Sequence, residues 1–359
     1  MGSGAKADIV PMPLDCHPTP DGQKGHQKNT EAAQEHVSFE RTTGEGSPQH
    51  NPGEQVANDT PVAAQTGDGD PGEDLALPDH TGTEYFRQIG LQLEPFSTSP
   101  DPVFFYASPS CTNGLQRLEV EVRLRRGLNL VLGEVGMGKT TMARVLVRRF
   151  QRIPEEFVCR LLSDPRHADE HELLTELTWL FEVRTDGDSI LALRNALRNF
   201  LFEKALEEGK AVVLIVDEGQ ALSGASVQVL RHLLNFETND QKLLQLVIFG
   251  QPEFQRQLQE QHNFADRINF GFVMRPFDET ATREMIAFRL NRAGLKEGAS
   301  LFTDGAMHAI HLCAEGVPRR ITMLCHDGLM AMLSRRQKTV DETLISLVAK
   351  RRAQFRGRR

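Results

Sequence analysis

The stretch LNLVLGEVGMGKTT, residues 128–141, decides the fold of this 359-residue chain. Its first five residues are mostly apolar and predict a short buried strand that ends at Leu132. Gly133 to Thr140 then satisfies the pattern G-x-x-x-x-G-K-[ST], and a helix is predicted from Lys139 to Phe150. A strand, a glycine-rich loop and a helix in this order are the setting that a phosphate-binding loop requires. The sequence therefore predicts a nucleotide-binding α/β protein.

The residue types of this loop fit the chemistry of a triphosphate. Glycines let backbone N–H groups turn inward around phosphate oxygens, and the start of the following helix adds partial positive charge. We expect Lys139 to reach the β and γ phosphates, Thr140 to ligate Mg²⁺, and Thr141 to lie near the α phosphate. The expected cofactors are therefore ATP and Mg²⁺. The other residues expected around the phosphates are Gly133, Glu134, Val135, Gly136, Met137 and Gly138.

A pair of carboxylates supplies the second half of the expected site. Val212 to Val216 is an uninterrupted apolar run, which predicts a strand buried on both faces of a parallel sheet, and Asp217 and Glu218 follow it directly. Ligands of open α/β sheets gather at the carboxyl ends of the strands. We therefore assign Asp217 to the magnesium ion and Glu218 to the base that activates the attacking water.

Alternating elements surround these two motifs. Further strands are predicted at Phe157–Leu162, Leu244–Phe249 and Ile268–Val273, with amphipathic helices between them, one of which places Trp179 in the core. Such alternation predicts a parallel sheet. Beyond Pro276 the strand signal stops, which predicts a small helical domain. Its predicted helices are Glu279–Ala293, Thr303–Ala314, Val317–Ser334 and Val340–Arg351.

Charge divides the chain unevenly. Residues 1–80 hold fourteen acidic and four basic side chains, a net charge of −10, whereas the whole chain carries −8. This segment has few apolar groups, so their burial could not offset the conformational entropy lost on folding. We therefore expect a disordered, solvated tail. The expected division is an acidic tail over 1–80, a nucleotide-binding domain over 81–276, a helical domain over 277–350 and a basic tail over 351–359.

The apolar runs and the cysteines indicate where in the cell the protein is expected. No apolar run approaches the roughly 20 residues that span a bilayer, and the N-terminus lacks the apolar segment of a signal peptide. The five cysteines form no CxxC pair, which is typical of reduced thiols. We expect a cytoplasmic protein without a membrane span.

Five segments, in the same order, resemble the general secretion pathway protein A family of AAA+ proteins. They are residues 85–109, the loop GEVGMGKTT, VDEGQ at 216–220, LVIFGQPE at 246–253 and GVPRRI at 316–321. The resemblance covers about residues 83–350. It implies the strand order 5-1-4-3-2, a lid formed by the C-terminal helices, and assembly into a homo-oligomer such as a ring.

The resemblance also implies roles for three polar residues. Gln251 follows the strand between the loop strand and the Asp217 strand, and is expected beside the γ phosphate as sensor 1. Arg267, just before the last strand, is expected to reach the neighbouring subunit's nucleotide and stabilise transition-state charge. Arg319, at the start of a lid helix, is expected to act as sensor 2.

Two departures from the family pattern matter. Better-known members continue into a transmembrane helix and a peptidoglycan-binding module, and we expect the ATPase domain alone here. The exit of the second strand reads Ser163-Asp164-Pro165, where relatives often place Asn before Pro. A residue there can restrain the catalytic glutamate, so we expect that control to differ.

The predicted function is ATP hydrolysis coupled to a protein partner, as an accessory ATPase of a secretion, pilus or export system. Two alternatives stay open. One is a DNA-associated AAA+ ATPase of the transposition or replication-loader type, and the other is a nucleotide-gated switch with little turnover. The sequence contains no base-reading motif, although the basic end at 350–359 could bind nucleic acid.

Overall fold

The computed structural model describes residues 85–259, 262–296 and 300–356. The acidic segment 1–80, which the sequence predicts to be disordered, lies outside these residues. So do residues 357–359 of the predicted basic tail.

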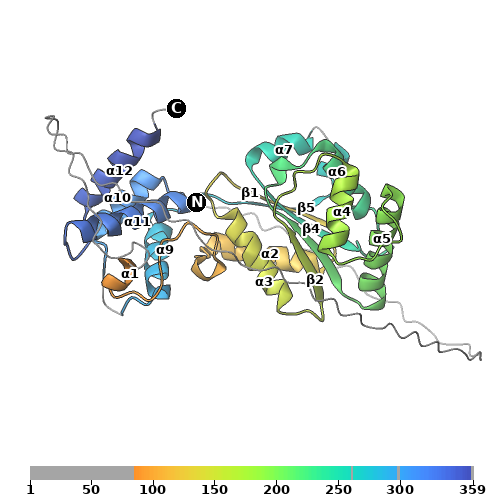
Figure 1. Ribbon diagram of the computed structural model, residues 1–359, viewed down its shortest axis with the longest axis horizontal. Helices are drawn as coiled ribbons and strands as arrows, with labels where there is room; N and C mark the ends of the chain where they lie inside the picture. Colours follow the sequence, from red (N-terminus) through yellow and green to blue (C-terminus); the bar gives the residue numbers. More distant parts are fainter. Residues whose placement is uncertain (1–84, 260–261, 297–299, 357–359) are drawn as a thin grey trace, which may run out of the picture. The chain divides into compact units, whose positions relative to one another are not determined.

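Five parallel strands form one sheet in the order β2-β3-β4-β1-β5 (Figure 1). This is the order that the sequence resemblance implies, and it confirms the predicted α/β fold. The central strands are buried along their whole length because helices cover both faces, and β5, at one edge, alternates between half-buried and exposed residues. The strands are β1 (Leu128–Leu132), β2 (Phe157–Leu162), β3 (Ala211–Val216), β4 (Leu244–Gly250) and β5 (Ile268–Val273).

Helices pack on both faces of the sheet (Figure 1). One face is covered by α2 (Pro109–Arg123) and α3 (Lys139–Gln151). The other face is covered by α4 (Glu170–Leu180), α5 (Ile190–Phe202), α6 (Gly224–Leu234) and α7 (Pro252–Gln259). A π-helical turn over Glu203–Glu207 extends α5, and the short helix α8 (His262–Ala265) precedes β5.

Helices α2 and α7 were not predicted from the sequence, and both begin at a proline. Proline suits the first turn of a helix because its missing N–H would have no partner there. Before α2, the side chain of Ser108 accepts a hydrogen bond from the backbone of Cys111 at 3.3 Å and caps the helix. Short helical turns were missed as well: α1 (Tyr85–Gln88), η1 (Pro102–Phe104) and η3 (Gly219–Ala221).

Four helices follow the sheet and form the lid: α9 (Glu279–Arg292), α10 (Asp304–Ala314), α11 (Pro318–Ser334) and α12 (Glu342–Arg356). Side chains of Asp278 and Thr303 cap the starts of α9 and α10. Helix α12 extends to Arg356 and so includes residues that the sequence analysis assigned to a basic tail.

The lid core includes residues from far earlier in the chain. Tyr85, Leu91, Phe96 and Phe104 are buried in the same apolar cluster as the lid helices. The Phe96 ring meets the Phe302 ring edge-on, with centroids 5.9 Å apart. We call residues 85–108 the strap. The predicted nucleotide-binding domain includes the strap. These four side chains of the strap pack with the lid, while Phe105 packs against the sheet.

The expectation for Trp179 is wrong. Its side chain is 77% exposed, because the buried face of α4 is formed by Leu173, Leu174 and Leu177 on the opposite side of the helix. The neighbouring Leu180 is half-buried against the core.

Candidate nucleotide-binding site

The loop between β1 and α3 depends on two glycines with left-handed backbone. Gly136 has φ +86° and Gly138 has φ +90°, a region that residues with a Cβ rarely adopt. A Cβ at Gly136 would also lie 3.0 Å from the Cβ of Arg319. Gly138 immediately precedes α3, whose first backbone N–H groups have no partner within the helix. The loop therefore has the backbone of an anion site.

Lys139 lies folded back onto this loop. Its ammonium donates hydrogen bonds to the carbonyl oxygens of Gly133 at 2.8 Å and Glu134 at 3.1 Å, and the residue is 6% exposed. Burial lowers the pKa of Lys139, while the nearby carboxylates of Glu218 and Asp217 act in the opposite direction. A phosphate placed in the loop would meet a cation already held there.

Asp217 stands at the end of β3, directly opposite the start of α3. It is 4% exposed, and burial raises its pKa while a hydrogen bond with the Thr140 side chain acts to lower it. Its carboxylate also accepts a hydrogen bond from the backbone N–H of Glu218 at 2.9 Å. Thr140 and Asp217, the two predicted magnesium ligands, are therefore in contact.

These two oxygen donors fit magnesium. Mg²⁺ prefers oxygen ligands and usually takes one or two from the protein, completing its shell with water and substrate phosphates. Among residues 85–259, 262–296 and 300–356, no group of three or more His, Cys, Asp or Glu side chains could hold a metal by itself. Thr140 and Asp217 would therefore fit a metal ion whose other ligands are water and the phosphates of a bound nucleotide.

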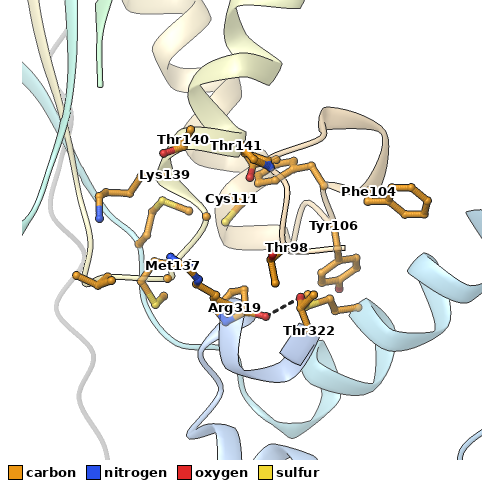
Figure 2. Close-up of a pocket in the computed structure, with 18 of the residues that line it drawn as sticks. Thr98, Phe104, Tyr106, Cys111, Met137, Lys139, Thr140, Thr141, Arg319 and Thr322 are labelled. Atoms are coloured by element: carbon orange, nitrogen blue, oxygen red, sulfur yellow. Dashed lines mark hydrogen bonds between the residues drawn. The ribbon is translucent and has the colours of Figure 1, made fainter. Parts of the chain in front are cut away.

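A cavity of about 340 Å³ extends from the loop to a set of aromatic residues. This volume lies within the roughly 300–1,000 Å³ of ligand pockets. The phosphate end of the cavity consists of loop residues 135–141 with Glu218. Figure 2 shows Lys139 on one side and Phe104 and Tyr106 on the other. The residues of the aromatic end are Phe104, Phe105, Tyr106, Met274 and Phe277.

Comparisons with known proteins agree with this geometry. A family model described as an AAA domain matches residues 122–258. The chain is 34% identical over 268 residues to General secretion pathway protein A of Aeromonas hydrophila, and the match covers 74% of this chain and 48% of that protein. This chain is an AAA+ protein of the general secretion pathway protein A family. It spans about half the length of that curated relative.

Solved structures share the AAA+ fold at low sequence identity. Cdc6p from Pyrobaculum aerophilum has a TM-score of 0.53 at 18% identity, covering 70% of this chain and 69% of that chain. The Aeropyrum pernix ORC2 protein, solved as ADPNP–ADP complexes, has a TM-score of 0.51 at 13% identity, covering 69% and 70%. These matches support the strand order and the layered architecture.

The positions of the two predicted sensors in this AAA+ protein are close to the cavity. Gln251 follows β4 and lines the cavity together with Glu218. Arg319 lies in the first turn of α11 and also lines the cavity; its backbone N–H donates to the carbonyl oxygen of Gly136 at 3.1 Å. The lid is thus hydrogen-bonded directly to the phosphate loop.

Arg267 lies at the amino-terminal end of β5, whereas the phosphate loop follows the carboxyl end of β1. It immediately precedes β5, and the first residue of β5, Ile268, pairs with Leu128 at the start of β1. At roughly 3.3 Å per strand residue, the length of β1 separates Arg267 from its own phosphate loop by about 16 Å. Arg267 is not among the residues that line the cavity of the same chain in the described structure. Its role in a neighbouring subunit stays a prediction.

Sequence reasoning missed the residue that contacts Glu218. The side-chain amide of Gln220 donates a hydrogen bond to the Glu218 carboxylate. Asp164, at the strand exit where we expected altered control, accepts two hydrogen bonds from the guanidinium of Arg166, at 2.7 Å each, on the surface. Gln220 stands within the VDEGQ segment, and its nearness in sequence to Glu218 was the available signal.

No helix among the described residues has both the length and the apolar character needed to cross a bilayer.

Proposed function

We propose that this protein binds Mg-ATP in the cavity and hydrolyses it. One observation carries the proposal. Lys139 and Thr140, from the phosphate loop, lie close to two carboxylates at the end of β3, those of Asp217 and Glu218. Membership of the AAA+ family supports a nucleotide as the ligand. The aromatic end of the cavity is suited to the nucleobase, because planar rings pack well on one another.

Each residue of the proposed site has its own role in hydrolysis. Lys139 leaves the carbonyls of the loop and holds the β and γ phosphates, while Thr140 and Asp217 hold the metal. A magnesium ion held by Thr140 and Asp217 would neutralise charge on the phosphate oxygens. Glu218 accepts the proton of the attacking water, and Gln251 orients the terminal phosphate. Arg319, bonded through its backbone to Gly136, reports the phosphate state to the lid.

One substitution tests the proposed base. Glu218→Gln should keep Mg-ATP affinity and lower turnover by about 100-fold or more, since general-base catalysis contributes roughly 10²–10⁴-fold. Lys139→Ala should abolish binding in calorimetry. Glu253→Gln is the matched control, because this carboxylate also acts on Lys139 but does not line the cavity in the described structure. Full turnover by Glu218→Gln at saturating ATP would refute the assignment.

We further propose that the active form is a homo-oligomer in which Arg267 completes the neighbouring site. Its position at the sheet edge away from its own loop supports this. Lys139→Ala and Arg267→Ala proteins should each be inactive. When mixed, an intact loop can face an intact arginine, so about a quarter of the sites should recover if subunits assemble at random. If the mixture stays inactive although the subunits exchange, the shared site is wrong.

For the process served, we propose an accessory ATPase of a secretion, pilus or export system, on the strength of the similarity to General secretion pathway protein A. A cytoplasmic location fits the four cysteines of the described residues, all of which are free thiols. The switch alternative gains some support from the folded-back Lys139. ATP retention with almost no turnover would favour that switch, and stimulation by double-stranded DNA that falls steeply with salt would favour a DNA-associated role.

A further inference from the structure

The Glu218 carboxylate is connected to the neighbouring strand through one side chain. The amide nitrogen of Gln220 donates to Oε2 of Glu218, and the amide oxygen of Gln220 accepts the backbone N–H of Gln251 at 3.0 Å. The donor and the acceptor of this amide are therefore both used. The bridge joins the end of β3 to the end of β4, the two places where the proposed base and sensor stand.

The backbone between Glu218 and Gln220 packs tightly against β4. Glu218 has φ +53°, a left-handed conformation that is uncommon for a residue with a side chain. A Cβ at Gly219 would lie 2.4 Å from the Cγ2 of Ile248, so this position accepts no side chain unless Ile248 moves. The next residue, Gln220, is thereby fixed beside the end of β4. The hydrogen bonds of Gln220 therefore start from a fixed backbone position. They use Oε2 of Glu218 and leave Oε1 for a water molecule.

We propose that Gln220 is a positioning residue: it orients the Glu218 carboxylate toward the cavity and keeps it in register with Gln251. Gln220 does not line the cavity of the described structure, whereas Glu218 and Gln251 do. It therefore acts through Glu218 and makes no direct contact with ATP. The inference rests on the proposed role of Glu218 as the base. It predicts that Gln220 contributes to turnover and leaves nucleotide affinity unchanged.

Two substitutions at Gln220 remove different hydrogen bonds of the bridge. Gln220→Met keeps the length of the side chain and loses both hydrogen bonds. Gln220→Glu keeps an oxygen that can accept the Gln251 N–H but has no donor for Glu218. We expect kcat to fall about 10-fold in both variants, since small misplacement of a reacting group is costly. KM for ATP should stay within about 2-fold in Gln220→Met, because this uncharged substitution leaves ground-state contacts unchanged.

The double variant Glu218→Gln/Gln220→Met distinguishes positioning from a general structural role. If Gln220 acts through Glu218, the double variant should show the same residual rate and ATP affinity as Glu218→Gln alone. A further loss in that background, or a raised KM in Gln220→Met, would overturn the inference. So would a wild-type kcat in Gln220→Met or Gln220→Glu. If Glu218→Gln itself retained turnover, the proposed base would fail first, and the role of Gln220 with it.

Discussion

The two ends of the cavity are built in different ways. The phosphate end consists of loop residues 135–141 with Glu218, which follow the carboxyl ends of β1 and β3 in the same sheet. The aromatic end combines the strap with residues 274–277, which connect β5 to the lid. The phosphate end is formed mainly by the α/β domain, whereas the aromatic end is formed by the strap and by the segment that connects this domain to the lid.

This difference has a functional consequence. At the phosphate end, backbone geometry and charge are set by the loop itself, and the lid enters through Arg319. At the aromatic end, Tyr106 of the strap packs edge-on against Phe277, with centroids 5.7 Å apart, and its hydroxyl donates to Glu284 on α9. A nucleotide that fills both ends contacts the loop and the lid together. Substitutions at the phosphate end should therefore weaken ATP binding strongly. Substitutions at the aromatic end should weaken it less, and by an amount that depends on how much of the ring is lost.

The largest effect in this comparison is expected at Gly136. Gly136→Ala places a side chain at φ +86° and within 3.0 Å of the Arg319 Cβ. Left-handed backbone costs a residue with a Cβ roughly 1–2 kcal/mol, and the Arg319 contact must also shift. We expect ATP affinity to fall by about 30-fold, measured by calorimetry. Gly271→Ala is the matched control, because a Cβ there would meet nothing within 4 Å, and affinity should not change. Equal affinities in the two variants would contradict the importance of the loop geometry.

The sheet could be predicted almost to the residue because its strands carry strong local signals. Predicted and observed bounds agree for Leu128–Leu132, Phe157–Leu162 and Ile268–Val273. Each is a short apolar or β-branched run between turn residues, and the chain alternates regularly around them. The strand order came from the family resemblance, since periodicity alone does not order strands.

Long-range packing could not be predicted in the same way. The lid core contains Phe96 and Phe104, yet nothing in the sequence around them indicates a partner about 200 residues later. Trp179 shows the same limit. It lies in a helix with apolar residues at several positions, and only the packed fold decides which face is buried. The phosphate end was predictable because its residue types are dictated by ligand chemistry. The roles assigned to its residues stay predictions.

A smaller, graded effect is expected at Tyr106. Tyr106→Ala removes a ring that packs against Phe277 and lies 5.9 Å from the Phe288 ring. Aromatic pairs contribute about 0.5–1.5 kcal/mol beyond the area they bury, so we expect KM for ATP to rise roughly 5-fold with kcat nearly unchanged. Tyr106→Phe keeps the ring and loses the hydrogen bond to Glu284, and it should stay close to the wild type. If Tyr106→Phe were as impaired as Tyr106→Ala, the hydroxyl link from the strap to α9 would govern ATP binding. The aromatic end would then act by holding the lid in place, and packing of its ring on the nucleobase would contribute little.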